Sequence, residues 1–143
     1  MKRHTSHFDP SSGVILVEAD IHGRIIAKSR LVFDTGATFC MLPWKLIDQV
    51  GIEIDQKDTI QTTTASGIET SPIVTIPRMS VLGYTVENVS CIVRDLPAMS
   101  GVDGLLGISF LKYFRVTLDF YKGHLVLAQR TTSSLDTYSF KLK

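Results

Sequence analysis

The chain has 143 residues, of which 44% are hydrophobic and 20% charged, and its formal net charge is +1. This composition is typical of one globular domain and excludes a disordered chain. The near-neutral charge predicts no nucleic acid as a partner. No apolar stretch approaches the roughly 20 residues that cross a bilayer, so we expect no membrane contact either. No apolar run follows the basic opening Met1-Lys2-Arg3-His4. We therefore expect no secretory signal and a cytoplasmic location.

The two cysteines, Cys40 and Cys91, are too few for a disulfide framework. Both stand among apolar or β-branched residues, which favours buried free thiols. A catalytic cysteine would need a histidine partner, but the four histidines lie in the N-terminal tail or beside turn glycines. We expect neither a metal nor a cofactor.

Polar residues dominate the first segment, so we interpret 1–12 as a loose N-terminal lead-in and 13–143 as a single domain. Alternation and β-branched residues predict short strands over 14–21, 25–27, 31–33, 38–42, 59–64, 68–76, 89–94, 105–106, 115–119, 124–128 and 138–142. Pro43 and Gly51 bound a predicted helix, and a second short helix is expected over 110–114. Many short strands with few helices argue for an all-β barrel or sandwich.

The strands 59–64 and 68–76 are joined by the small residues Ala65, Ser66 and Gly67. They are more polar than the other predicted strands, so we expect this hairpin to project from the domain. Trp44, at the start of the first helix, is expected to pack in the core.

The stretch Leu31-Val32-Phe33-Asp34-Thr35-Gly36-Ala37 runs from an apolar strand into a single acid and a tight turn. Asp, Thr and Gly all favour turns, so Asp34 could serve only the turn. A buried strand that delivers a carboxylate beside a glycine could also deliver a catalytic acid, because glycine lets other groups approach closely. The stretch alone leaves both readings open.

Three features occur in order: Asp34-Thr35-Gly36-Ala37 after an apolar strand, the projecting hairpin, and Leu105-Leu106-Gly107 before a short helix. Together they resemble the retropepsin-like, single-lobe aspartic proteases over most of the chain, roughly 13–128. The resemblance implies a closed retropepsin-like β-barrel with a flap hairpin and one or two short helices. The enzyme would be a homodimeric aspartic endopeptidase.

The resemblance also implies roles for individual residues. Asp34, Thr35 and Gly36 would be catalytic: Asp34 with the water, Thr35 hydrogen-bonded to the other subunit, and Gly36 offering its N–H near the carboxylate. The substrate-binding residues would be Ala37, Ala65, Ser66, Gly67, Ile68 and Ile108. Leu42 and Ile73 are further candidates for the pocket walls.

With a single Asp-Thr-Gly in so short a chain, the resemblance implies that the second aspartate comes from a second copy. Two close carboxylates push their pKa values apart and can share one proton, as is well known for aspartic proteases. The paired Asp34 groups would activate a water at mildly acidic pH. A peptide or protein would be the substrate, bound as an added strand under the flap.

Other readings remain open at this stage. Asp103 is the only internal rival as a partner for Asp34, although it reads better as a loop residue. The helix that follows apolar-apolar-Gly in the family often opens with a charged or amide residue, whereas Ile108-Ser109 stands here. The same fold could be a non-catalytic dimeric peptide- or protein-binding module, and an unrelated β-barrel ligand carrier is a third possibility.

Overall fold

The computed structural model describes residues 3–97 and 101–129 of the chain. Two short helices and ten strands follow one another in that part. Their order is β1 (Arg3–His7), β2 (Leu16–His22), β3 (Ile26–Phe33), β4 (Cys40–Leu42), α1 (Trp44–Val50), β5 (Thr59–Thr64), β6 (Gly67–Val81), β7 (Tyr84–Val93), β8 (Gly104–Leu106), α2 (Ile108–Leu111), β9 (Phe114–Asp119) and β10 (His124–Gln129).

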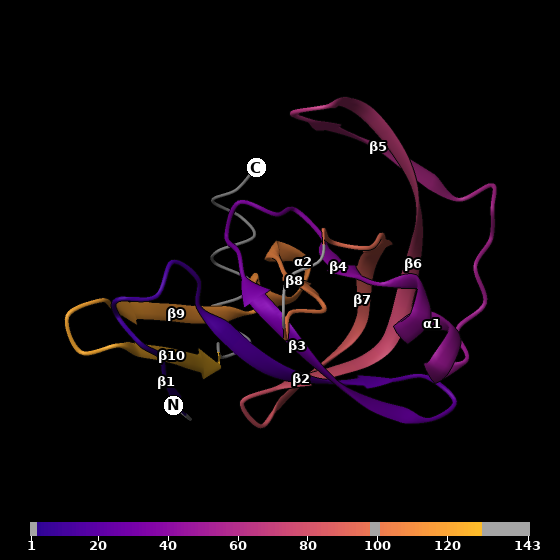
Figure 1. Ribbon diagram of the computed structural model, residues 1–143. Coiled ribbons are helices and arrows are strands. Elements are labelled where there is room, and N and C mark those ends of the chain that lie inside the picture. Colours follow the sequence, from indigo (N-terminus) through magenta and orange to yellow (C-terminus); the bar gives the residue numbers. More distant parts are fainter. Residues whose placement is uncertain (1–2, 98–100, 130–143) are drawn as a thin grey trace, which may run out of the picture.

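Six strands close into a barrel (Figure 1). They neighbour one another in the order β2-β3-β8-β4-β7-β6, and a pairing between β2 and β6 completes the ring. Strand β5 lies outside the ring at the free edge of β6, and β1, β10 and β9 form a separate three-stranded sheet. The sequence left a barrel or a sandwich open, and the structure is the barrel.

The barrel is filled because its strands alternate. In β3, Ala27, Ser29, Leu31 and Phe33 are buried while the residues between them are more exposed. Helix α1 adds its apolar face, Leu46, Ile47 and Val50, to the same core. It ends at Gly51, whose φ of +75° is the left-handed conformation that glycine adopts readily. The predicted limits of this helix are confirmed.

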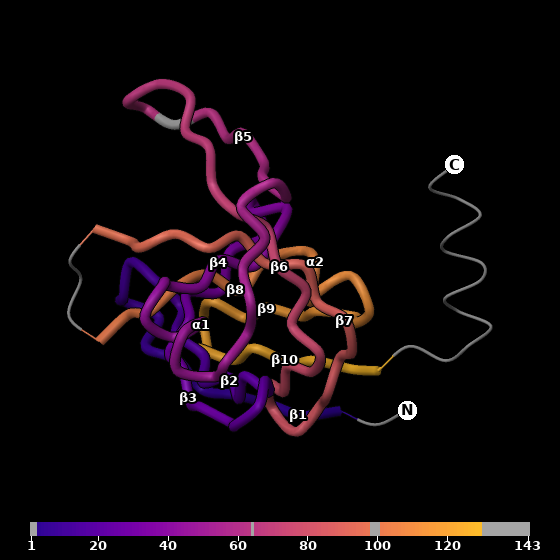
Figure 2. Tube along the Cα trace, turned by 90° about the vertical axis from the view of Figure 1, so that its right-hand side faces the viewer, coloured from indigo at the N-terminus to yellow at the C-terminus, as the bar shows by residue number. Residues whose placement is uncertain are grey.

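Strand β6 is long and changes partner along its length. Its second part pairs with β7 from Ile73 to Val81, whereas residues 67–72 pair only with β5. We call this two-stranded part, residues 59–72, the arm. Figure 2 shows the arm projecting from the barrel, as the polar strands and the turn at Ala65 and Ser66 predicted.

Two expectations about the N-terminal half are wrong. Residues 3–7 are not a loose lead-in but strand β1, which pairs with β10 from Arg3↔Ala128 to His7↔His124. Trp44 is not a core residue, since it is 41% exposed. It is the first residue of α1, and the buried face of that helix is formed by residues further along it.

Other differences concern strand and helix limits. The two predicted strands 25–27 and 31–33 form one continuous strand, β3, which pairs with β2 along its length. Helix α2 begins at Ile108, two residues before the predicted start. The predicted strand 138–142 lies outside the described residues.

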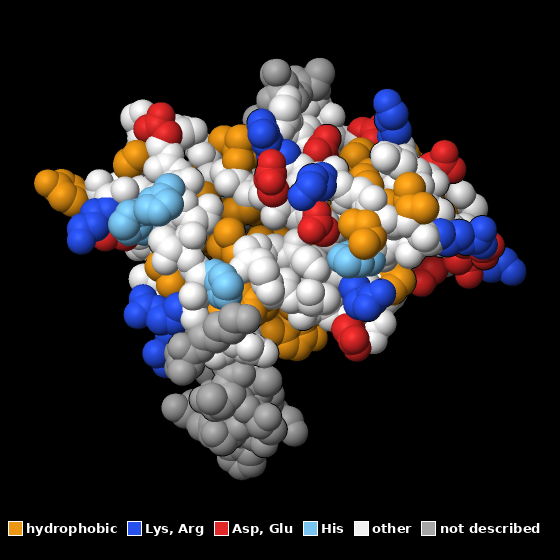
Figure 3. Space-filling model, turned by 90° about the horizontal axis from the view of Figure 1, so that it is seen from below, with side chains coloured by type: hydrophobic (Ala, Val, Ile, Leu, Met, Phe, Trp, Pro, Cys, Tyr) orange, Lys and Arg blue, Asp and Glu red, His pale blue; other side chains and the backbone are white. Residues whose placement is uncertain are grey.

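The face opposite the arm carries acidic and basic side chains close together, with no block of one sign (Figure 3). This agrees with the formal net charge of +1. Among the described residues, none of the helices is long and apolar enough to cross a membrane.

Candidate active site

The loop Asp34–Ala37 follows β3 where that strand lies beside β8. Strand β8 is inserted between β3, to which it is parallel, and β4, to which it is antiparallel. The N–H of Asp34 donates to the carbonyl of Leu106 at 3.0 Å, which extends the pairing of β3 and β8 by one residue. The acid therefore stands at the end of a buried strand whose position is fixed on both sides.

The carboxylate of Asp34 folds back on its own loop. Its Oδ1 accepts the N–H of Gly36 at 2.9 Å, and the N–H of Ala37 donates to the Asp34 carbonyl at 3.3 Å. The side chain of Asp34 is half-buried, and Thr35 is exposed. Neither Oδ2 of Asp34 nor the hydroxyl of Thr35 has a hydrogen-bond partner among the described residues. One carboxylate oxygen thus holds the loop, and the other is open to a ligand.

Residues after β8 support the loop from behind. The N–H groups of Ile108 and Ser109 donate to the carbonyls of Ala37 and Thr38 at 2.8 and 2.9 Å. This approach requires Gly107, because a Cβ at that position would lie 2.5 Å from the Phe39 carbonyl oxygen and 2.6 Å from that of Ala37. The apolar-apolar-Gly motif therefore has a physical reason here: only glycine lets the two segments meet.

Ser109 supplies a cross-link at the start of α2, where the resemblance implied a charged or amide residue. Its hydroxyl accepts the N–H of Cys40 at 2.9 Å and donates to the carbonyl of Ser90 at 2.8 Å. One hydroxyl thus joins β4, α2 and β7 directly behind the loop. The departure at Ile108-Ser109 leaves the domain tied together through a shorter side chain.

Cys40 and Cys91 are free and buried, as predicted. They face each other as partners in the pairing of β4 with β7. The Cys91 thiol lowers the pKa of Cys40 to about 7 by hydrogen bonding to it, with Ser109 and the N–H of Gly107 acting in the same direction and burial opposing them. Burial and the neighbouring Cys40 sulfur raise the pKa of Cys91.

A cavity of about 490 Å³ opens beside Asp34. Its lining combines the loop and the nearby barrel strands with strand β5 of the arm. The lining residues are Asp34, Gly36, Ala37, Thr38, Phe39, Met41, Ile60, Gln61, Thr62, Thr63, Ile92, Arg94 and Leu105. A larger hollow, of about 680 Å³, lies at α1 around Trp44 and contains no residue of the loop.

The structure brings together only part of the predicted site. Asp34, Gly36 and Ala37 line the cavity, and Thr35 stands exposed beside them. Four other predicted binding residues, Ala65, Ser66, Gly67 and Ile68, lie at the exposed tip of the arm and outside the cavity wall.

Three further pocket candidates also lie outside the lining. Ile108 is 37% exposed, whereas Leu42 is fully buried in the core and cannot form a pocket wall. Ile73 is half-buried at the point where β6 meets β7.

Several cavity residues were not predicted. Leu105 lines the cavity because it alternates with Leu106, which points into the core. Arg94 lines it as well, directly after the buried end of β7. A charged residue immediately after an apolar strand was one of the signals that pointed to Asp34, and Arg94 has the same pattern.

Asp103 has a structural partner in β3. Its Oδ2 accepts the N–H of Arg30 at 2.8 Å and lies 3.4 Å from the hydroxyl of Ser29, and its own N–H donates to the Arg30 carbonyl. It is not among the residues that line the cavity with Asp34. In the part of the chain that the structure describes, no cluster of three or more His, Cys, Asp or Glu could hold a metal ion.

A family model described as "Aspartyl protease" matches residues 17–110, which contain the Asp34 loop, the arm and β8. The chain therefore belongs to this aspartyl protease family. Among solved structures, it is similar to a retropepsin-like aspartic protease from Rickettsia conorii, with a TM-score of 0.63 and 21% identity over 88% of each chain. The fold is thus retropepsin-like. No match was found among curated protein sequences.

Proposed function

We propose that the protein is an aspartic endopeptidase that works as a homodimer, with one Asp34 from each subunit. The observation that carries the proposal is the shared cavity, because Asp34 and residues of strand β5 of the arm both line it. A peptide placed there would meet both a carboxylate and the edge strand β5. Membership of the aspartyl protease family supports the same reading.

In this mechanism the open Oδ2 of Asp34 holds the attacking water together with the carboxylate of the second subunit. The two acids share one proton, so one acts as the general base and the other as the general acid. Activity should therefore be greatest at mildly acidic pH. The N–H of Gly36 keeps the carboxylate oriented, and the hydroxyl of Thr35, which is an exposed residue, would hydrogen-bond to the partner subunit.

The arm would act as the flap that covers the substrate. Strand β5 is the edge of its sheet, so an extended peptide can pair with it. Side chains of the peptide would then meet the apolar part of the lining, Phe39, Met41, Ile92 and Leu105. The exposed tip around Ile68 would meet substrate only when the arm closes.

Asp34→Asn tests the catalytic role. Asparagine retains an oxygen that can accept the Gly36 N–H, so the loop should keep its shape while the general base is lost. We expect kcat/KM for a peptide library to fall by at least about 10³-fold. Asp55→Asn is the matched control, because Oδ1 of Asp55 accepts the N–H of Lys57 at 2.9 Å in the same i to i+2 geometry, away from the cavity.

Mixing subunits tests the dimer. If every active site needs two Asp34 groups, a ninefold excess of Asp34→Asn protein should reduce the activity of a fixed amount of wild-type protein to about a tenth. A monomeric enzyme would keep its activity in the same mixture. An Asp34→Asn variant that cleaves peptides as fast as wild type would refute the catalytic proposal. A peptide that binds to the wild-type protein without being cut would favour the alternative, a non-catalytic binding module.

A further inference from the structure

Arg94 stands at the root of the arm, where β6 leaves the barrel. The pairing of β6 with β7 includes Ile73↔Ile92, and β7 ends at Val93. The same antiparallel register, continued by two residues, places Ser71 opposite Arg94. Residues directly opposite in an antiparallel pair have side chains on the same face. Arg94 is therefore aimed at the first part of β6 that has no barrel strand beside it.

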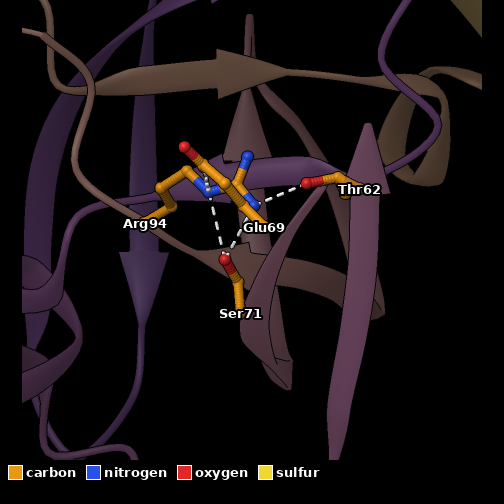
Figure 4. A network of polar contacts seen from close by, with 4 residues as sticks. All are labelled: Thr62, Glu69, Ser71 and Arg94. Carbon is orange, nitrogen blue, oxygen red and sulfur yellow. Dashed lines mark hydrogen bonds and ion pairs between the residues drawn. The ribbon is translucent and has the colours of Figure 1, made fainter. Parts of the chain in front are cut away.

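The guanidinium of Arg94 contacts this part of β6 and the neighbouring strand β5 (Figure 4). Its Nε and Nη2 both donate to the hydroxyl of Ser71, at 3.0 and 2.8 Å. Nη2 also donates to the hydroxyl of Thr62 on β5, and Nε lies 3.3 Å from a carboxylate oxygen of Glu69. One side chain from the barrel thus contacts both strands of the arm.

Because these groups are buried, losing their contacts would cost free energy. Ser71 is only 5% exposed and is one of two buried polar residues in the described part of the chain. A buried hydroxyl without a partner is costly, and Arg94 is the partner that Ser71 has. The Arg94 side chain is itself only 21% exposed, so the planar guanidinium is held by several contacts in a partly dry site.

The backbone of Arg94 is anchored to the barrel. Its N–H donates to the carbonyl of Leu42 at 3.0 Å, next to the pairing of Leu42 with Val93. Arg94 also lines the cavity together with Asp34 and Thr62. The residue therefore joins the rigid barrel wall, the arm and the candidate active site.

We propose that Arg94 is a positioning residue that holds the root of the arm over the cavity beside Asp34. Beyond the end of β7, the Arg94 side chain replaces the missing backbone pairing and fixes the angle at which the arm leaves the barrel. The catalytic consequence rests on the proposed protease function, whereas the structural consequence does not. If the arm held its position in only about one molecule in ten, only that fraction could bind the peptide, so the apparent Kd for the peptide, and hence KM, would rise about tenfold.

Hydrogen exchange on the full-length chain separates the two consequences. In Arg94→Met, amide exchange of residues 59–72 should accelerate by about tenfold or more, while β2 and β3 keep their protection. Arg78→Met is the matched control, since Arg78 lies on β6 within the barrel, is exposed, and its side chain has no hydrogen bond or ion pair among the described residues. Thr62→Val removes one acceptor on the arm and should give a smaller change in the same segment.

Peptide cleavage supplies the second measurement. Arg94→Met should raise KM about tenfold and leave kcat within about twofold, and Arg94→Lys should restore only part of the loss because one ammonium cannot replace the fork of donors. If amide exchange accelerates only in the arm of Arg94→Met, and the wild-type protein cuts no peptide, the role of Arg94 is supported and the proposed protease function is refuted. Unchanged arm exchange in Arg94→Met, or exchange that rises equally in the barrel, would overturn the role of Arg94.

Discussion

Replacing Ser109 with alanine removes a hydroxyl that serves two backbone groups at once. The Ser109 hydroxyl accepts the N–H of Cys40 and donates to the carbonyl of Ser90, at 2.9 and 2.8 Å. Cys40 is fully buried, and Ser90 is half-buried. Alanine fits the space but offers neither contact, and water has little access to the N–H that is left behind.

The expected loss of stability follows from these two contacts. The lost hydrogen bond to Ser90 contributes about 1 kcal/mol net, and the loss of the bond to Cys40, which leaves a buried N–H without a partner, costs about 1–3 kcal/mol. We therefore expect Ser109→Ala to lower the free energy of unfolding by about 2–4 kcal/mol. That is a large part of the roughly 5–15 kcal/mol that a domain has in total.

Urea unfolding followed by tryptophan fluorescence measures this change. Ser11→Ala is the control, because the Ser11 hydroxyl donates to Asp9 at 2.7 Å in an exposed turn, where its loss should cost no more than about 0.5 kcal/mol. A Ser109→Ala variant that unfolds at the same urea concentration as Ser11→Ala would refute the reasoning. It would mean that water or a local shift satisfies the Cys40 N–H.

Two more predictions concern the same region. Gly107→Ala should lower the free energy of unfolding by about 1–3 kcal/mol and abolish cleavage, since its Cβ would overlap the Ala37 and Phe39 carbonyls. Urea unfolding and peptide cleavage measure the two effects, and wild-type values for both would contradict the prediction. The Cys40 thiolate should appear near pH 7 in absorbance at 240 nm, and Cys91→Ala should move its pKa up toward the ordinary 9.0 by removing the strongest donor. Because the folded-state pKa of Cys40 lies below the unfolded value, its contribution to stability should grow from pH 7 to 9 and vanish as the pH falls through 7. An unchanged absorbance midpoint in Cys91→Ala would contradict the hydrogen bond between the two sulfurs.

Local signals predicted the elements that local physics determines. Helix α1 lies within Pro43 and Gly51, as expected, because a proline start and a left-handed glycine stop act over one turn. Strand β5 spans Thr59–Thr64 as expected, and the arm follows from its polar strands and small turn residues. The loop at Asp34 was identified from the apolar strand before it and from the order of the motifs after it.

Nonlocal contacts explain the rest. Strand β1 has the polar sequence Arg3–His7 and is a strand only because it pairs with β10, more than a hundred residues later. The role of Arg94 depends on the register of β6 and β7, which no pattern within either strand specifies. The cavity lining mixes residues from the loop, the arm and β8, so it follows from the closed barrel and not from any one segment.

The insertion of β8 has a consequence for synthesis of the chain. Strand β8 has three residues and fills the space between β3 and β4, which precede it by more than sixty residues. Hydrogen bonds with Leu106, Ile108 and Ser109 support the Asp34 loop from outside it. Contacts of such long sequence separation form late in folding. While these residues have not left the ribosome, a nascent chain carries its acid on a loop that lacks these hydrogen bonds, so the site can form only after Ser109 has emerged.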